Sequence, residues 1–180
     1  MLPRIIFGTA VLLFASLLSA ATLEQLSLDE MTQKSTAIVR ARVTGSYAAV
    51  SGSIIYTHYR VSVSERWKGP EAAELDVVVP GGAAAGQRQS FSGAPKLAGD
   101  SEYVLFLWTG TRGLTHIIGL SQGVFNVSRG AGGELDVYRA ASGEMMLDSA
   151  GRPVHDQSIS FRMSDLRNRV SRVVAKGAVK

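Results

Sequence analysis

The segment from Ile54 to Pro70, IIYTHYRVSVSERWKGP, decides the fold. From Ile55 the odd positions are mainly apolar and read Ile55, Thr57, Tyr59, Val61, Val63, Glu65 and Trp67. The even positions are mainly polar and read Tyr56, His58, Arg60, Ser62, Ser64 and Arg66. A period of two predicts a strand with one buried face. The strand is longer than the usual ~5 to 6 residues, so we expect it to coil and bend as strands do in a small barrel.

Other elements on both sides of this strand can be read from the same kinds of pattern. Ser27 to Glu30 reads as a capping box, which predicts a short helix. Ile38 to Tyr47 alternates as a half-buried strand, and Gly45 to Ser53 is rich in Ser, Gly and Ala and reads as the connection to the central strand. Leu75 to Val79 predicts a short strand. Tyr103 to Thr109, YVLFLWT, is apolar throughout, which is typical of a strand covered on both faces.

The last third of the chain predicts two hairpins and a helix. His116 to Leu120 and Val124 to Val127 read as a closing hairpin. Leu135 to Tyr138 and Met145 to Leu147 read as a smaller one. A final helix capped by Ser164 carries one apolar face, formed by Leu166, Val170, Val173 and Val174.

These elements together predict a mainly β protein. We expect a small OB-like antiparallel barrel, closed or partly open, with a short N-terminal helix before it and a C-terminal helix after it. The expected domain is single and spans residues 22–180, with the barrel core at 26–128 and the C-terminal hairpin and helix at 129–180.

Residues 1–21 predict an export signal. Arg4 precedes an apolar run from Ile5 to Leu18, and small residues follow at Ser19, Ala20 and Ala21. The run is too short to span a bilayer, so we expect a cleaved signal peptide and a periplasmic or secreted protein that is not an integral membrane protein after cleavage. The chain has no cysteine, which excludes disulfides and thiolate metal sites.

A basic stripe is the candidate binding surface. Two strands paired antiparallel would place five side chains on one outer face: Arg40, Arg42, His58, Arg60 and Arg66. Such a stripe fits an acidic glycan, a lipid head group or an acidic protein surface. The alternative is a solvated face that discourages edge pairing. Export disfavours nucleic acid as a partner. The long polar stretch from Ala83 to Gly99 is a second place where part of a site is expected.

No pattern in the sequence predicts catalysis, a metal or a cofactor. The histidines His58, His116 and His155 lack the spacing of a metal pair, and neither HExxH nor GxSxG occurs. Gly81-Gly82 lacks the strand, helix and lysine context of a phosphate-binding loop.

Two stretches carry a resemblance to a known family. The order of short helix, Ile38 to Val43, and then Tyr59-Arg60-Val61 leading to Trp67-Lys68-Gly69-Pro70 resembles the N-terminal OB-type barrel of the tissue inhibitors of metalloproteinases. Gly99 to Tyr103 and Leu105 to Leu107 resemble exported bacterial proteins of uncharacterised function that share this barrel pattern. The inhibitors chelate the protease zinc through a mature N-terminal cysteine, whereas the mature N-terminus here would be Thr22 or Ala21.

The function expected from the sequence is that of an exported, non-catalytic binding module. Its partner would be an envelope or extracellular protein, a protease among them, or an acidic glycan. The first alternative is a metalloprotease-inhibitor-like protein, which the family resemblance implies and which needs a free mature N-terminus. A further alternative is an envelope enzyme of unknown type.

Overall fold

The structure is a computed structural model that describes residues 23–130 and 132–177. The signal peptide predicted at residues 1–21 lies outside the described residues. Within these two described ranges, no helix is both long enough and apolar enough to cross a membrane.

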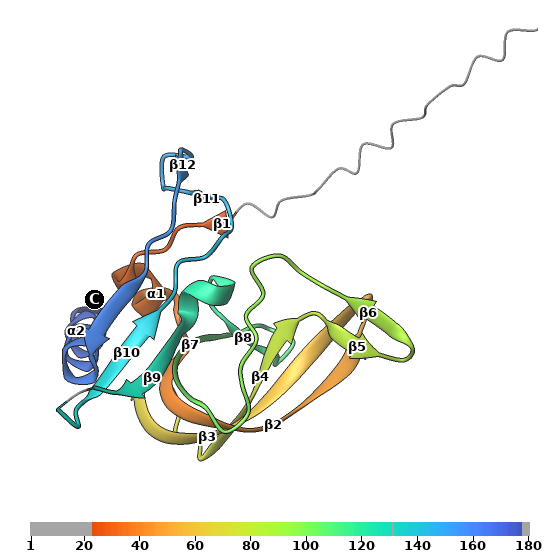
Figure 1. Ribbon diagram of the computed structural model, residues 1–180, viewed down its shortest axis with the longest axis horizontal. Coiled ribbons are helices and arrows are strands. Elements are labelled where there is room, and N and C mark those ends of the chain that lie inside the picture. Colours follow the sequence, from red (N-terminus) through yellow and green to blue (C-terminus); the bar gives the residue numbers. More distant parts are fainter. Residues whose placement is uncertain (1–22, 131, 178–180) are drawn as a thin grey trace, which may run out of the picture.

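The fold is mainly β, with a short helix near its start and a longer helix at its end, as the sequence predicts (Figure 1). In chain order the elements are β1 (Leu23–Glu24), α1 (Leu28–Lys34), β2 (Ala37–Ser51), β3 (Ile54–Lys68), β4 (Glu74–Pro80), β5 (Gly82–Ala84), β6 (Gln87–Gln89), β7 (Glu102–Thr109), β8 (Thr115–Ile117), the 3-10 turn η1 (Leu120–Gly123), β9 (Val124–Arg129), β10 (Leu135–Arg139), β11 (Met146–Leu147), β12 (Pro153–Val154), β13 (Ile159–Arg162) and α2 (Met163–Gly177).

Five strands form a ring. The largest sheet runs in the order β13-β10-β9-β7-β2-β3-β4-β8, and an additional pairing between β7 and β8 closes β7, β2, β3, β4 and β8 on themselves. All pairings in the ring are antiparallel except that of β4 with β8, which is parallel. The ring therefore occupies the place of the expected barrel but is not wholly antiparallel.

Two separate cores stabilise the fold, and β7 contributes to both. One core fills the ring and includes Val39, Val61 and Leu105. The other lies between the sheet and the two helices and includes Phe106 and Leu166. Alternate side chains of β7 enter opposite cores, which is why its sequence is apolar at nearly every position. The prediction of a strand covered on both faces is confirmed from Tyr103 to Leu107, whereas Trp108 and Thr109 are exposed.

Both helices begin close to where the sequence places them. Ser27 caps α1, its Oγ accepting a hydrogen bond from the amide of Glu30, while the Glu30 carboxylate accepts one from the amide of Ser27. The capping box is confirmed. Helix α2 begins at Met163, so Ser164 lies inside its first turn, and the prediction of Ser164 as the cap is wrong. Leu166, Val170 and Val173 are buried as expected.

Three predicted connections differ from the structure. β8 pairs with β4 and β7 while β9 pairs with β7 and β10, so the predicted hairpin of His116 to Val127 is wrong. β10 and β11 do not pair with each other, because β10 joins β9 and β13 and β11 joins β1 and β12. The segment predicted as the connection from Gly45 to Ser53 is mostly strand, because β2 continues to Ser51.

One buried ion pair ties the C-terminal half of the chain together. Arg139 at the end of β10 donates to Asp156 Oδ1 over 2.6 Å and to the carbonyl of Gln157 over 3.1 Å. The Asp156 carboxylate also accepts hydrogen bonds from the amides of Ser142 and Gln157. Both charged side chains are almost fully buried, with 5% and 2% of their surface exposed.

Candidate functional site

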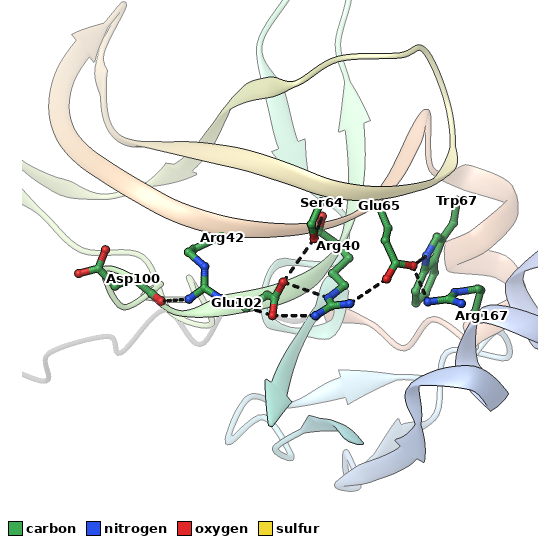
Figure 2. A network of polar contacts seen from close by, with 8 residues as sticks. All are labelled: Arg40, Arg42, Ser64, Glu65, Trp67, Asp100, Glu102 and Arg167. Atoms are coloured by element: carbon green, nitrogen blue, oxygen red, sulfur yellow. Dashed lines mark hydrogen bonds and ion pairs between the residues drawn. The ribbon is translucent and has the colours of Figure 1, made fainter. Parts of the chain in front are cut away.

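Arg40 lies inside a network of ion pairs on the outer face of the ring (Figure 2). Its Nη1 donates to Glu65 Oε1 over 2.8 Å, and its Nη2 donates to Glu102 Oε2 over 3.0 Å. Its Nε lies 3.0 Å from Glu102 Oε1. Only 18% of the Arg40 side chain is exposed, so two carboxylates neutralise a largely buried guanidinium.

A β-bulge brings Glu65 to Arg40. Arg40 pairs with Glu65 but the next residue, Ala41, pairs with Val63, so Ser64 is an extra residue in β3. A bulge of this kind interrupts the alternation of side chains between the two faces. Glu65 therefore lies on the outer face beside Arg40, and its predicted place on the inner face with Val63 is wrong.

The network continues from the ring to helix α2. The Glu65 carboxylate accepts a hydrogen bond from Trp67 Nε1 over 3.2 Å and forms an ion pair with Arg167 of α2. The Arg167 guanidinium lies over the Trp67 ring, 5.8 Å from its centroid. Figure 2 shows these side chains joining β3 to α2. The network thus positions the C-terminal helix against the sheet.

The other members of the predicted stripe lie in three different places. Arg42 donates to the carbonyl of Asp100 over 2.6 Å, and 53% of its side chain is exposed. His58 stacks on Tyr47 with ring centroids 4.6 Å apart, and Arg60 lies over the same ring. Arg66 pairs in register with Val39, so it lies on the opposite face of β3 from Glu65 and Arg40.

By register, four of the five candidate residues share one face of β2 and β3, where their contacts join them as two pairs, and only Arg66 lies on the opposite face. Arg40 and Arg42 meet around Glu102, and His58 and Arg60 meet around Tyr47. The carboxylate of Asp76 lies 2.8 Å from His58 Nδ1. Carboxylates thus offset part of the positive charge that the sequence suggests, and a binding role for these five residues stays a prediction.

Acid is expected to weaken the network at Glu65. Burial alone would raise the pKa of Glu65, but hydrogen bonds from Arg40 and Trp67 and the charge of Arg167 hold it below the ordinary 4.5. A lowered pKa means that this stabilisation is complete above the unfolded-state value and is lost as the pH falls through the folded-state value. Glu65→Gln should therefore flatten the fall of unfolding free energy below about pH 4.5. Urea denaturation at a series of pH values measures this, and an unchanged slope would contradict it.

A pocket at the end of β4 is the candidate binding site, which we call the rim pocket. It has a volume of about 290 Å³. Its lining residues belong to β3, to the end of β4, to the β5–β6 hairpin and to the chain that follows it. Figure 1 labels these strands. Its lining residues are Thr57, Tyr59, Val79, Pro80, Gly81, Gly82, Arg88, Gln89, Ser90, Phe91, Ala94, Pro95 and Lys96. Most of them belong to the Ala83 to Gly99 stretch or adjoin it, where the sequence predicts part of a site.

Two glycines allow the chain to turn into the rim pocket. Gly81 and Gly82 have φ values of +107° and +139°, which residues with a side chain rarely adopt. A Cβ on Gly82 would lie 2.8 Å from Thr57 Oγ1 and 3.2 Å from the Ala48 side chain. Gly82 therefore permits a close approach of the backbone to the ring.

Hydrogen bonds hold the walls of the rim pocket in place. Gln89 accepts from the amide of Ile55 over 2.7 Å and donates to the carbonyl of Ser53 over 2.9 Å. Thr57 donates to the carbonyl of Gly81 over 2.7 Å. The Tyr59 hydroxyl accepts a hydrogen bond from the amide of Leu97. The pocket is therefore shaped before a ligand binds, which lowers the entropy cost of binding.

The rim pocket carries positive charge. Arg88 and Lys96 are exposed in its lining, and no lining residue is an aspartate or glutamate. Among the described residues, neither of these two cations forms an ion pair. Tyr59, Phe91 and Pro95 add apolar surface. Cations beside apolar walls suit an anionic group that is attached to a partly apolar ligand.

The three histidines have different surroundings. His58 stacks on Tyr47, while burial between strands lowers the pKa of His116. His155 is exposed and lines a separate crevice beside Ser27 and Asp156. Within residues 23–130 and 132–177, no three His, Cys, Asp or Glu side chains gather in a way that could hold a metal ion.

Sequence signals for the rim pocket were weak. The long polar stretch marked the region, but Arg88 and Lys96 stand in no recognisable motif. Comparison of the chain with known protein families and with curated proteins finds no match.

Proposed function

We propose that this protein is an exported, non-catalytic binding module that takes an acidic group of a glycan into the rim pocket. The observation that carries the proposal is that Arg88 and Lys96 both line a pocket whose lining holds no carboxylate. Export itself rests on the sequence pattern of residues 1–21.

The size and chemistry of the rim pocket favour one acidic sugar unit of a longer chain. A volume of about 290 Å³ lies at the lower end for ligand pockets, so it accommodates a small group and leaves the rest of a polymer outside. Gln89 and Ser90 offer amide and hydroxyl groups that can pair with sugar hydroxyls. Phe91 and Pro95 offer surface for the apolar face of a sugar ring.

Reversing the charge of the rim pocket tests the proposal. Arg88→Glu combined with Lys96→Glu should weaken binding of an oligogalacturonate probe at least about tenfold, since two attractive charges become repulsive. Isothermal titration calorimetry measures the affinity, and added salt should weaken binding to the unsubstituted protein. An oligoglutamate probe of equal charge shows whether a carboxylated peptide serves as well as a carboxylated sugar.

A matched control separates the pocket from overall charge. Arg112→Glu combined with Lys176→Glu makes the same change in net charge at exposed positions outside the rim pocket. This control should bind the oligogalacturonate nearly as the unsubstituted protein does. Equal weakening by both double variants would show unspecific attraction. Unchanged binding by the pocket variant would place the site elsewhere.

A further inference from the structure

Among the described residues, the second half of β2 has no strand hydrogen-bonded to its outer edge, although β5 contacts β2 and its Gly82 lies beside Ala48. Ala37 to Arg42 pairs with β7, and hydrogen bonds with Asp100 and Ser101 cover Val43. From Thr44 to Ser51, β2 pairs only with β3, and in the part of the chain that the structure describes no backbone hydrogen bond reaches its other side. Most of this stretch falls within Gly45 to Ser53, which the sequence alone predicts as a connection.

Beside this stretch, in contrast, the side of β3 that faces away from β2 is covered. β4 pairs with β3 from Tyr56 to Ser62. Beyond that pairing, the amide of Gly81 donates to the carbonyl of Ile55 over 2.7 Å, and the amide of Ile55 donates to Gln89. The hairpin of β2 and β3 thus has one closed side and one open side.

The contacts of Ile55 show which backbone groups face the open edge. The N–H and the C=O of Ile55 both form hydrogen bonds on the side of β3 that faces away from β2. Ile55 and its partner in β2, Val50, are therefore a non-hydrogen-bonded pair. In such a pair Val50 must point its own N–H and C=O away from β3. The side to which the N–H and C=O point alternates from one residue to the next along an antiparallel strand. The N–H and C=O of Ala48 and Ser46 therefore also point away from β3.

We propose that this edge pairs with the same edge of a second copy of the chain, antiparallel and around a two-fold axis at Ala48. Ala48 would then pair with the partner subunit's Ala48, and Ser46 with the partner subunit's Val50. Three hydrogen-bonded pairs give about six hydrogen bonds between the subunits. The contact is closed by its two-fold symmetry, so it produces a dimer and not a fibre.

The side chains along the edge are compatible with self-pairing. Thr44 to Ser51 contains no charged residue and no proline, which are the residues that commonly prevent edge pairing. The edge residues themselves therefore bring no like charges together, and the nearest cation, Arg60, lies over the Tyr47 ring. Tyr47 is 44% exposed and would lie across the small side chain of the partner subunit's Ala49. Val50, which is 50% exposed, would be covered as well.

Sedimentation velocity over a wide range of protein concentration tests the dimer, together with hydrogen exchange of single amides. The unsubstituted chain should dimerise as its concentration rises, and exchange of the Ala48 and Val50 amides should slow at least about tenfold, because both amides become hydrogen-bonded. Ala48→Pro removes a central donor without removing a bond to β3, so this variant should stay monomeric. The inference does not rest on the proposed function.

A second variant and a control keep the test decisive. Val50→Lys places a charge at an exposed edge position and should also give a monomer. Ser62→Lys places the same charge on an exposed position of β3, which is paired on both sides, and should leave dimerisation unchanged. A chain that stays monomeric at every concentration, or a dimer that survives both Ala48→Pro and Val50→Lys, overturns the proposal. The proposal is also overturned if the Ala48 and Val50 amides are protected only when a different polypeptide is bound.

Discussion

An unfolding free energy lower by about 3 to 5 kcal/mol is the expected result of replacing Asp156 by alanine. The change leaves the Arg139 guanidinium buried with only the carbonyl of Gln157 as a hydrogen-bond acceptor. It also removes the acceptor for the amides of Ser142 and Gln157. A buried charge without its counter-ion has lost its hydration and has no ion pair to compensate for that loss, so breaking such a pair destabilises the fold strongly.

Urea denaturation measures the loss, and a double variant identifies its cause. Arg139→Met combined with Asp156→Leu removes both charges, so it should be clearly more stable than Asp156→Ala. A loss of less than about 1 kcal/mol for Asp156→Ala would show that water or a shift of Arg139 solvates the freed charge. Since small domains are stable by only about 5 to 15 kcal/mol, the single variant should also unfold at a lower temperature.

Arg40→Ala is expected to lower the unfolding free energy by about 2 kcal/mol. It leaves Glu65 and Glu102 close together without the cation that bridges them. The loss is smaller than for a fully buried pair because 15% to 27% of these side chains remains exposed to water. The same variant should bind the oligogalacturonate probe as the unsubstituted protein does, because Arg40 does not line the rim pocket.

Arg42→Ala is the matched control for this prediction. Arg42 is also an arginine of β2, but more than half of its side chain is exposed, so its removal should cost less than about 1 kcal/mol. Equal losses for the two variants would contradict the structural role of Arg40. Weaker glycan binding by Arg40→Ala, at unchanged stability, would instead support the basic stripe.

The metalloprotease-inhibitor-like function and the envelope enzyme remain predictions from the sequence. The inhibitor function depends on a mature N-terminus that lies outside the described residues. The first described residues pair with β11, since the amide of Leu23 donates to the carbonyl of Met145 and the amide of Gln25 to that of Leu147.

The candidate site shows where sequence patterns stop being informative. Alternation along β3 correctly predicts that Ile55, Tyr59 and Val61 are buried. It fails at Glu65 because a bulge depends on the pairing of two strands, and one strand read alone cannot show it. The predicted stripe loses Arg66 to the opposite face for the same reason, and carboxylates from β3 and β7 neutralise Arg40.

The sequence by itself determined the local features of this protein. The capping box of α1, the long alternating β3, the doubly covered β7 and the apolar face of α2 are all visible in it, because hydrophobic periodicity and helix caps act between residues close in the chain. Only the tertiary structure decided which strands pair, that β4 and β8 close the ring in parallel, and that β2 ends in an open edge. Those outcomes depend on burial shared between distant segments, which no single segment encodes.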